Sequence, residues 1–330
     1  VYADVDGNIG WRPAVYIPIR KMGYSMAPRP GWDKSFEWDG YVPFEEMPFI
    51  YNPPEGYIST ANNKTIGNDF PFYISGLWAD PSRSSRIKEV LEEDKKFSLE
   101  DMKSLQLDLT SNYSKEILPA ILKNAGTYEN PIFNRAIQFL NDWNHVESID
   151  SEGTLIFHSI SNEIIRNIYY DELSVLGDKY FETYIGLKYI TKRNLRRILK
   201  SHTNKWVDDI RTPNKNETID EIITKSIESG IQKVVDTYGP NWSNWKWGSA
   251  HSLTHKHILG DIKILNYLFN LNIGPFLSGG SDVTPNAGGY SIHKGFNQTS
   301  GASMRRIVDF SDLNMTNMIL PTGQSGLHNS

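Results

Sequence analysis

A chain of 330 residues is long enough to bury a large core and can form one large domain or two. Its formal net charge of −5, with both signs mixed along the chain, argues against nucleic acid as a partner. No apolar run approaches about 18 residues, so we expect no membrane span, and the absence of cysteine excludes disulfides, thiolate catalysis and cysteine–zinc sites.

The N-terminal part of the chain combines β-prone runs with loops. Residues 2–11 alternate loosely around a turn sequence and predict a β-hairpin. Residues 12–56 are rich in proline, which indicates ordered loops and short strands. The apolar run over 56–61 predicts a further strand, which ends at the paired side-chain amides of Asn62 and Asn63 before a loop.

The middle of the chain has helical patterns. Ser98 and Thr218 each begin a capping-box sequence, and the apolar face after Ser98 predicts one helix that continues to Ile117. Helices are also predicted over residues 84–93, 131–144, 154–173, 176–200 and 218–238. The basic run from Lys192 to Lys205 is interpreted as a solvated helix face.

After Gly239 the pattern returns to short β-prone runs, at residues 289–293, 305–310 and 318–320, separated by turn residues as in an antiparallel sheet. The chain therefore divides into a sheet-forming segment 1–94, a mainly helical region 95–240 and a β-rich segment 241–330 that returns to the sheet. This order predicts an α+β fold with sheet contributed by both ends.

Several motifs follow one another in order at the two ends of the chain. They are Tyr2-Ala3-Asp4-Val5-Asp6-Gly7-Asn8, Pro28-Arg29-Pro30-Gly31-Trp32, Trp38-Asp39-Gly40-Tyr41-Val42-Pro43, Asn52-Pro53-Pro54-Glu55-Gly56, Ala61-Asn62-Asn63 and, far downstream, Leu320-Pro321-Thr322-Gly323-Gln324-Ser325-Gly326. In this combination they resemble the β-subunit of the penicillin acylase family, the N-terminal-nucleophile (Ntn) amidohydrolases. The resemblance implies the C-terminal portion of a β-subunit, with the Ntn-hydrolase αββα four-layer sandwich incomplete in this chain.

The resemblance also implies a chemistry. In the family a Ser, Thr or Cys at the N-terminus of the β-subunit attacks a linear amide, with its own α-amino group as base. This residue, a Ser by expectation, would lie outside residues 1–330. Asn62 matches the family's oxyanion-hole asparagine, and Asn63 is expected to be its structural neighbour. Without the resemblance, the same two residues would indicate a turn.

Arg83 follows Trp78 by five residues, which is the spacing of the family's pocket arginine. The resemblance implies that it orders the asparagine region and binds a substrate carboxylate. Arg86, one helical turn further on, is the alternative. A surface salt bridge at the start of a helix is the non-functional interpretation of both residues.

No cofactor is expected for the chemistry, and no metal ligand is assigned in this chain. A structural calcium ion is implied by the family, mostly bound outside this chain; Asp69 is the best local candidate, although Phe72 stands nearer the expected place. His251, His255 and His257 have ligand-like spacing, but without an acidic partner they favour a core or hydrogen-bonding role.

The resemblance implies that the chain is a piece of a longer autoproteolytic precursor. Its partners would be the remaining β-subunit segment, the α-subunit and a small N-acyl amide, such as a penicillin or an acyl-homoserine lactone. Penicillin amidase activity is the first expectation within this class of hydrolases that act on non-peptide carbon–nitrogen bonds. A periplasmic or extracellular location is implied by resemblance only. The alternative function is a catalytically inactive relative or an aromatic-rich binding module for carbohydrate or peptide, since the chain holds 9 Trp and 17 Tyr.

Overall fold

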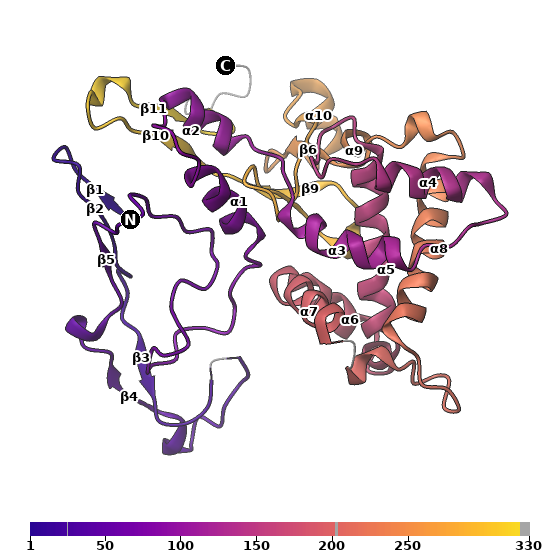
Figure 1. The fold of residues 1–330 in the computed structure, drawn as a ribbon, viewed down its shortest axis with the longest axis horizontal. Coiled ribbons are helices and arrows are strands. Elements are labelled where there is room, and N and C mark those ends of the chain that lie inside the picture. Colours follow the sequence, from indigo (N-terminus) through magenta and orange to yellow (C-terminus); the bar gives the residue numbers. More distant parts are fainter. Residues whose placement is uncertain (25, 202–203, 324–330) are drawn as a thin grey trace.

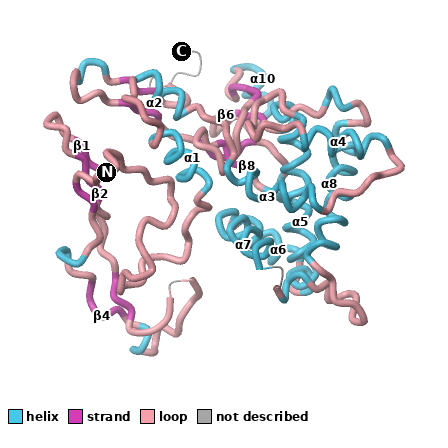
Figure 2. The backbone as a smooth tube through the Cα atoms, in the orientation of Figure 1, coloured by secondary structure: helices cyan, strands magenta, loops and turns pink. Residues whose placement is uncertain are grey.

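The computed structural model describes residues 1–24, 26–201 and 204–323, and these residues combine helices and sheets. The helices gather in the middle of the chain, while the N-terminal residues form an extended arm of loops and short strands (Figures 1 and 2). The predicted α+β class is confirmed. The closing motif extends to residue 326, so its last three residues lie outside the described part of the chain.

The arm holds two small antiparallel sheets. The predicted hairpin is confirmed: β1 (Tyr2–Ala3) pairs with β2 (Ile9–Trp11), and β5 (Ile50–Tyr51) pairs with the other edge of β2. The second sheet pairs β3 (Pro18–Arg20) with β4 (Trp38–Tyr41). Only a small buried cluster, Ile17, Val42 and Met47, lies beneath these strands. Packing within the arm therefore contributes little to its stability.

The predicted strand over residues 56–61 is wrong. None of these residues belongs to a strand, and no strand of the described chain pairs with them. The backbone N–H of Ala61 donates instead to the side chain of Asn63, at 3.0 Å. A β-prone sequence forms a strand only beside another strand that accepts its backbone hydrogen bonds.

Most helices begin and end where the sequence signals predict. Both capping boxes form, at Ser98 and at Thr218, and Gly239, with φ +80°, follows the last helix of the middle region. The helices of this part are α1 (Ser82–Leu91), α2 (Leu99–Gln106), α3 (Asn112–Lys123), α4 (Pro131–Asn141), α5 (Glu152–Val175), α6 (Asp178–Gly186), α7 (Lys188–Ser201) and α8 (Ile219–Tyr238).

Two predicted helices are each divided in two. Between α2 and α3, Asp108 accepts the N–H of Thr110 and Ser111 accepts the N–H of Ser114, so side chains satisfy the backbone and a new helix starts. The predicted helix over 176–200 is interrupted at Leu187, between α6 and α7. Between α2 and α3, local side-chain capping therefore outweighs a continuous apolar pattern.

Helix α5 forms the centre of the core. Residues on all of its sides are buried, and they include polar side chains such as His158 and Glu163 as well as the apolar ones. It packs against α8 most extensively, and also against α4 and α6. The close approach of α8 requires Gly230, because a Cβ there would lie 2.8 Å from the Cα of Ile160. The large aromatic side chains Trp245 and Trp247 are fully buried in the same core.

The C-terminal segment forms a four-stranded sheet and a separate hairpin. Its elements are α9 (Trp247–Ala250), β6 (Ser252–His255), α10 (Lys263–Phe269), β7 (Ile273–Leu277), β8 (Gly288–Tyr290), β9 (Gln298–Gly301), β10 (Arg305–Ile307) and β11 (Asn317–Ile319). The sheet order is β7-β6-β9-β8, and β10 pairs with β11. The predicted antiparallel pattern is confirmed for β10 with β11 and for β8 with β9, whereas β6, which was not predicted, pairs with β9 in parallel.

The interpretation of residues 192–205 as a solvated face is wrong for three basic residues of α7. Lys192 is buried and forms an ion pair with Asp282 of the C-terminal segment. Arg193 and Arg196 reach the loop that leads into α1. Their partners lie about ninety or more residues away along the chain, which no local charge pattern can reveal.

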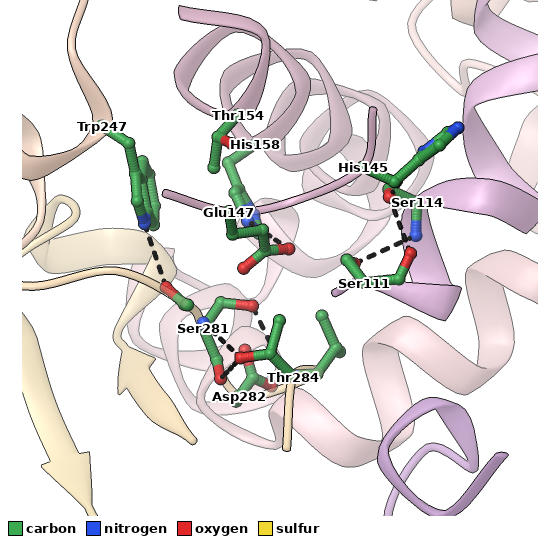
Figure 3. Close-up of polar contacts among 12 residues, drawn as sticks. Ser111, Ser114, His145, Glu147, Thr154, His158, Trp247, Ser281, Asp282 and Thr284 are labelled. Carbon is green, nitrogen blue, oxygen red and sulfur yellow. Dashed lines mark hydrogen bonds and ion pairs between the residues drawn. The ribbon is translucent and has the colours of Figure 1, made fainter. Parts of the chain in front are cut away.

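A buried polar network joins the helices to the C-terminal segment (Figure 3). Nε2 of His158 lies 3.2 Å from Oε1 of Glu147, and both side chains are almost fully buried. The His158 ring stacks on Trp247, with 4.7 Å between ring centroids, and its Nδ1 lies 3.1 Å from the hydroxyl of Tyr290.

Among the described residues, no helix is both long and apolar enough to cross a membrane.

The buried Lys192–Asp282 ion pair leads to a prediction about the free energy of unfolding. We expect Asp282→Asn to lower the free energy of unfolding by about 3–5 kcal/mol, because the buried Lys192 ammonium loses its counter-charge. The double variant Lys192→Met, Asp282→Asn removes both charges and should recover most of the loss. Urea unfolding at pH 7 measures both values. An equal loss in the single and double variants would contradict this account.

The same ion pair predicts that the free energy of unfolding depends on pH. Burial raises the pKa of Asp282, but Lys192 and Lys188 outweigh burial, and the net pKa lies below the ordinary value. The stabilisation is therefore fully present above the ordinary pKa of about 4 and is lost as pH falls through the lower folded-state pKa. Between pH 5 and pH 2 the wild type should lose more stability than Asp282→Asn.

Candidate functional site

Asn62 occupies a left-handed backbone position at the start of a loop. Its φ of +63° is one that asparagine tolerates better than most residues other than glycine. Its carbonyl accepts the N–H of Ala79 at 2.8 Å, which ties the turn to the segment before α1. The side chain of Asn62 is exposed.

Arg83, in the first turn of α1, fixes the orientation of this amide. Its Nη2 donates to the carbonyl of Ala61 and to Oδ1 of Asn62, each at 2.8 Å. A guanidinium can only donate, so the atom that faces it must be the oxygen of the Asn62 side chain. The Nδ2 group of Asn62 is thereby left as a donor, and it forms no hydrogen bond to any described residue.

Asn63 has a different role. Its Oδ1 accepts the N–H of Ala61, and its Nδ2 donates to the carbonyl of Lys64 at 3.1 Å. Both halves of this amide are therefore used within the turn. The structure places Asn63 as the structural neighbour of Asn62, as the sequence suggested.

Helix α7 supports the loop that runs from the asparagine turn into α1. Arg193 donates to the carbonyl of Gly76 at 2.9 Å and to that of Trp78 at 3.4 Å. Arg196 donates to Oδ1 of Asp80 at 3.1 Å.

Asp80 itself is buried and accepts the N–H of Ser82, the first residue of α1. Arg196 also donates to the Ser82 hydroxyl, at 2.9 Å. Arg193 and Arg196 therefore fix the backbone on both sides of Ala79, the residue that binds the carbonyl of Asn62. Sequence reasoning missed both arginines.

Arg86, the alternative to Arg83, does not reach Asn62. Its guanidinium forms an ion pair with Asp108 at 2.7 Å and a weaker one with Glu89 at 3.3 Å. These contacts join α1 to the connection between α2 and α3. The structure therefore brings Arg83 to the asparagine and gives Arg86 a role in packing.

The described residues offer no metal centre: no group of three or more His, Asp or Glu side chains among them could hold an ion. Asp69 is exposed, and a single carboxylate cannot supply the six to eight oxygens that calcium takes. The implied calcium stays an expectation that concerns residues elsewhere. His251 is buried, with its Nδ1 2.6 Å from the carbonyl of Phe296 and its ring stacked on Trp247.

A groove of about 1140 Å³ lies apart from Asn62, between α2, the β6–β9 part of the sheet and the β10–β11 hairpin. A carbohydrate-binding groove would present aromatic rings to stack on sugars. None of the described residues that line this groove is Phe, Tyr or Trp. It therefore gives no support to the aromatic-rich binding module.

The family model for penicillin amidase matches residues 1–330. The chain belongs to the penicillin amidase family. Its relatives include the acyl-homoserine lactone acylase QuiP of Pseudomonas fluorescens (strain Pf0-1), which is 26% identical over 345 residues covering 99% of this chain and 40% of that protein. Another is the penicillin acylase 2 proenzyme of Pseudomonas sp. (strain SE83), 36% identical over 111 residues, or 34% of this chain and 14% of that protein.

A solved structure shares the fold. The thermostable penicillin G acylase from Alcaligenes faecalis superposes with a TM-score of 0.53 and 18% identity, covering 74% of this chain and 47% of that one. The resemblance inferred from the motifs and the Ntn-hydrolase fold class are confirmed. The chain spans about two fifths of the length of the QuiP relative from P. fluorescens Pf0-1.

The different contacts of the two arginines of α1 predict different effects on kcat and on stability in the complete penicillin amidase family protein that contains this chain. Arg83→Ala should lower kcat about tenfold or more, since Asn62 loses the contact that orients its amide. Arg86→Ala should leave kcat unchanged and lower the free energy of unfolding by about 1–3 kcal/mol, because a partly buried ion pair is lost.

Steady-state kinetics with two substrate types, one with a carboxylate and one neutral, measure the first effect, and urea unfolding measures the second. A loss confined to KM for the carboxylate substrate would show that Arg83 binds substrate and does not orient Asn62. Equal kinetic losses in the two variants would contradict the division of roles.

Proposed function

We propose that residues 1–330 form the C-terminal portion of the β-subunit of an acylase that hydrolyses a linear amide in an N-acyl compound. The observation that carries the proposal is the bond from Arg83 to Oδ1 of Asn62, which leaves the Nδ2 group directed away as a donor. Membership of the penicillin amidase family supports it.

The proposed reaction passes through an acyl-enzyme on an N-terminal Ser that lies outside residues 1–330. The α-amino group of that residue has an ordinary pKa near 8, so it can act as a base at neutral pH, unlike a lysine with a pKa near 10.4. The hydroxyl oxygen attacks the amide carbon as its proton passes to the α-amino group, and the carbonyl oxygen becomes an oxyanion. When this intermediate collapses, the carbon–nitrogen bond breaks and the amine leaves with that proton; water then hydrolyses the ester and releases the acid. Asn62 donates its Nδ2–H to that oxyanion.

The stabilisation that Asn62 gives to the oxyanion depends on two conditions. Its donor must be oriented before the reaction, and Arg83 supplies that orientation. It must also be removed from bulk water, since a hydrogen bond in water contributes little. Because the Asn62 side chain is exposed in this chain, we propose that polypeptide from the rest of the β-subunit and from the α-subunit covers it.

The acyl-homoserine lactone acylases supply the first substrate class to test, because their similarity extends over 99% of this chain. The similarity to the two penicillin acylase relatives covers 34% of this chain or less, so penicillins are the second substrate class to test. No cofactor enters the proposed reaction. A periplasmic or extracellular location and a structural calcium held mainly by other segments are part of the same proposal.

Asn62→Ala tests the proposal in the complete protein. Loss of a buried oxyanion donor should lower kcat about a hundredfold or more, equivalent to about 3 kcal/mol, with little change in KM. Amine release from N-acyl-homoserine lactones and from penicillin G measures turnover. Asn63→Ala is the matched control and should reduce kcat far less, because its amide is used within the turn.

Wild-type turnover in Asn62→Ala would remove this residue from the mechanism. A complete protein that releases no amine from either substrate class, and that carries neither Ser, Thr nor Cys at the N-terminus of its β-subunit, would favour the inactive relative. Thermal unfolding of each variant shows whether a loss of turnover comes from loss of the fold.

A further inference from the structure

The groove of about 1140 Å³ between α2, the β6–β9 part of the sheet and the β10–β11 hairpin, which we call the hairpin groove, carries charge of one sign. Its lining includes Lys103, Lys256, Arg305 and Arg306, and none of the described residues that line it is Asp or Glu. Lys103 pairs with Glu100 of its own helix, whereas the other three cations form no ion pair with a described residue. A hollow lined by cations attracts anionic ligands.

Arg305 is held in place within the hairpin groove by two neutral acceptors. Its Nη1 donates to the carbonyl of Gln106 and its Nη2 donates to Oδ1 of Asn286, each at 2.6 Å. A guanidinium carries five N–H donors, so further donors remain free. Burial lowers the pKa of the Arg305 guanidinium, and neither partner carries a charge that offsets this burial. An oriented, partly buried cation without a counter-charge is suited to an anion.

The lining beside Arg305 is aliphatic. Arg305 lies directly opposite Ile319 in the hairpin, and Ile307 follows two residues later, so these three side chains lie on one face. Leu107, after α2, and Leu253 of β6 line the same groove. Aliphatic side chains without an aromatic ring among them offer nothing for a nucleobase or a sugar to stack on, but they suit a flexible hydrocarbon chain.

We propose that the hairpin groove binds a linear aliphatic carboxylate. The carboxylate accepts hydrogen bonds from the N–H groups of Arg305 that Gln106 and Asn286 leave free, and the hydrocarbon chain covers Leu107 and Ile319. A cationic ligand would be repelled by the lining, and a neutral hydrocarbon would leave Arg305 without a counter-charge. The groove lies apart from Asn62, and this proposal does not depend on the proposed reaction.

Cysteine labelling of the complete protein tests the site, because residues 1–330 contain no cysteine of their own. Leu107→Cys places a thiol in the hairpin groove and Leu176→Cys places one at the end of α5; the two leucines are 56% and 63% exposed. Saturating decanoate, below its critical micelle concentration, should slow the reaction of Leu107→Cys with a maleimide about tenfold or more and leave Leu176→Cys unchanged. Decanol, which has the chain without the charge, should need an about tenfold higher concentration for the same protection.

Arg305→Gln and Ile319→Glu test the contact with the carboxylate. In the Leu107→Cys background, each should raise the decanoate concentration that gives half protection about tenfold or more, since the first removes the cation and the second places a carboxylate opposite it. Ile319 is 63% exposed, so Ile319→Glu keeps the test available if thermal unfolding shows that Arg305→Gln does not fold. Lys123→Gln removes one charge on α3, outside the groove, and should leave the half-protection concentration unchanged.

Several results would overturn the proposal. A Leu107→Cys thiol that reacts only after unfolding of the complete protein would show that other polypeptide fills the hairpin groove. Equal protection by decanol and decanoate would show that charge is not recognised, and equal slowing at Leu176→Cys would show non-specific binding. Unchanged half protection in both Arg305→Gln and Ile319→Glu would exclude the carboxylate contact. None of these measurements depends on turnover, so each of them leaves the proposed role of Asn62 unaffected.

Discussion

The ion pair and hydrogen bonds made by helix α7 hold the two ends of the chain to the helical core. On one helix, Lys192 binds Asp282 of the C-terminal segment, while Arg193 and Arg196 bind the loop that carries the asparagine turn. The arm has little buried apolar surface of its own, so its position depends on these polar contacts. A buried charge without its partner is costly, which makes the arrangement specific.

The contacts made by α7 fix the position of Asn62 through a short series of further contacts. Arg193 fixes the carbonyls around Leu77, Ala79 binds the carbonyl of Asn62, and Arg83 holds its side chain. The donor of Asn62 is therefore oriented before any substrate arrives, which is the condition under which a hydrogen bond contributes most to catalysis.

Signals that act over a few residues were predictable from the sequence. The capping boxes at Ser98 and Thr218 and the hairpin at the N-terminus depend on local spacing. The contact of Arg83 with Asn62 spans 21 residues and was expected only from the family resemblance. The strand expected before Asn62 does not form, and no strand of the described chain pairs with these residues. The roles of Arg193 and Arg196 were not predictable, because a basic run looks the same whether it faces water or carbonyls more than a hundred residues away.

The contact between α7 and the C-terminal segment also sets an order of events during synthesis. Lys192 and Asp282 are 90 residues apart, which a ribosome adding about 5–20 residues per second takes roughly 5–18 s to cover. During that interval the nascent helical region carries an ammonium group that has no counter-ion at its final position, and Trp247, which stacks on His158, is added only part-way through it. Lys192 and His158 therefore reach their final surroundings only after residues 247–282 have been made, so this part of the core is completed by segments that lie far from it in the sequence.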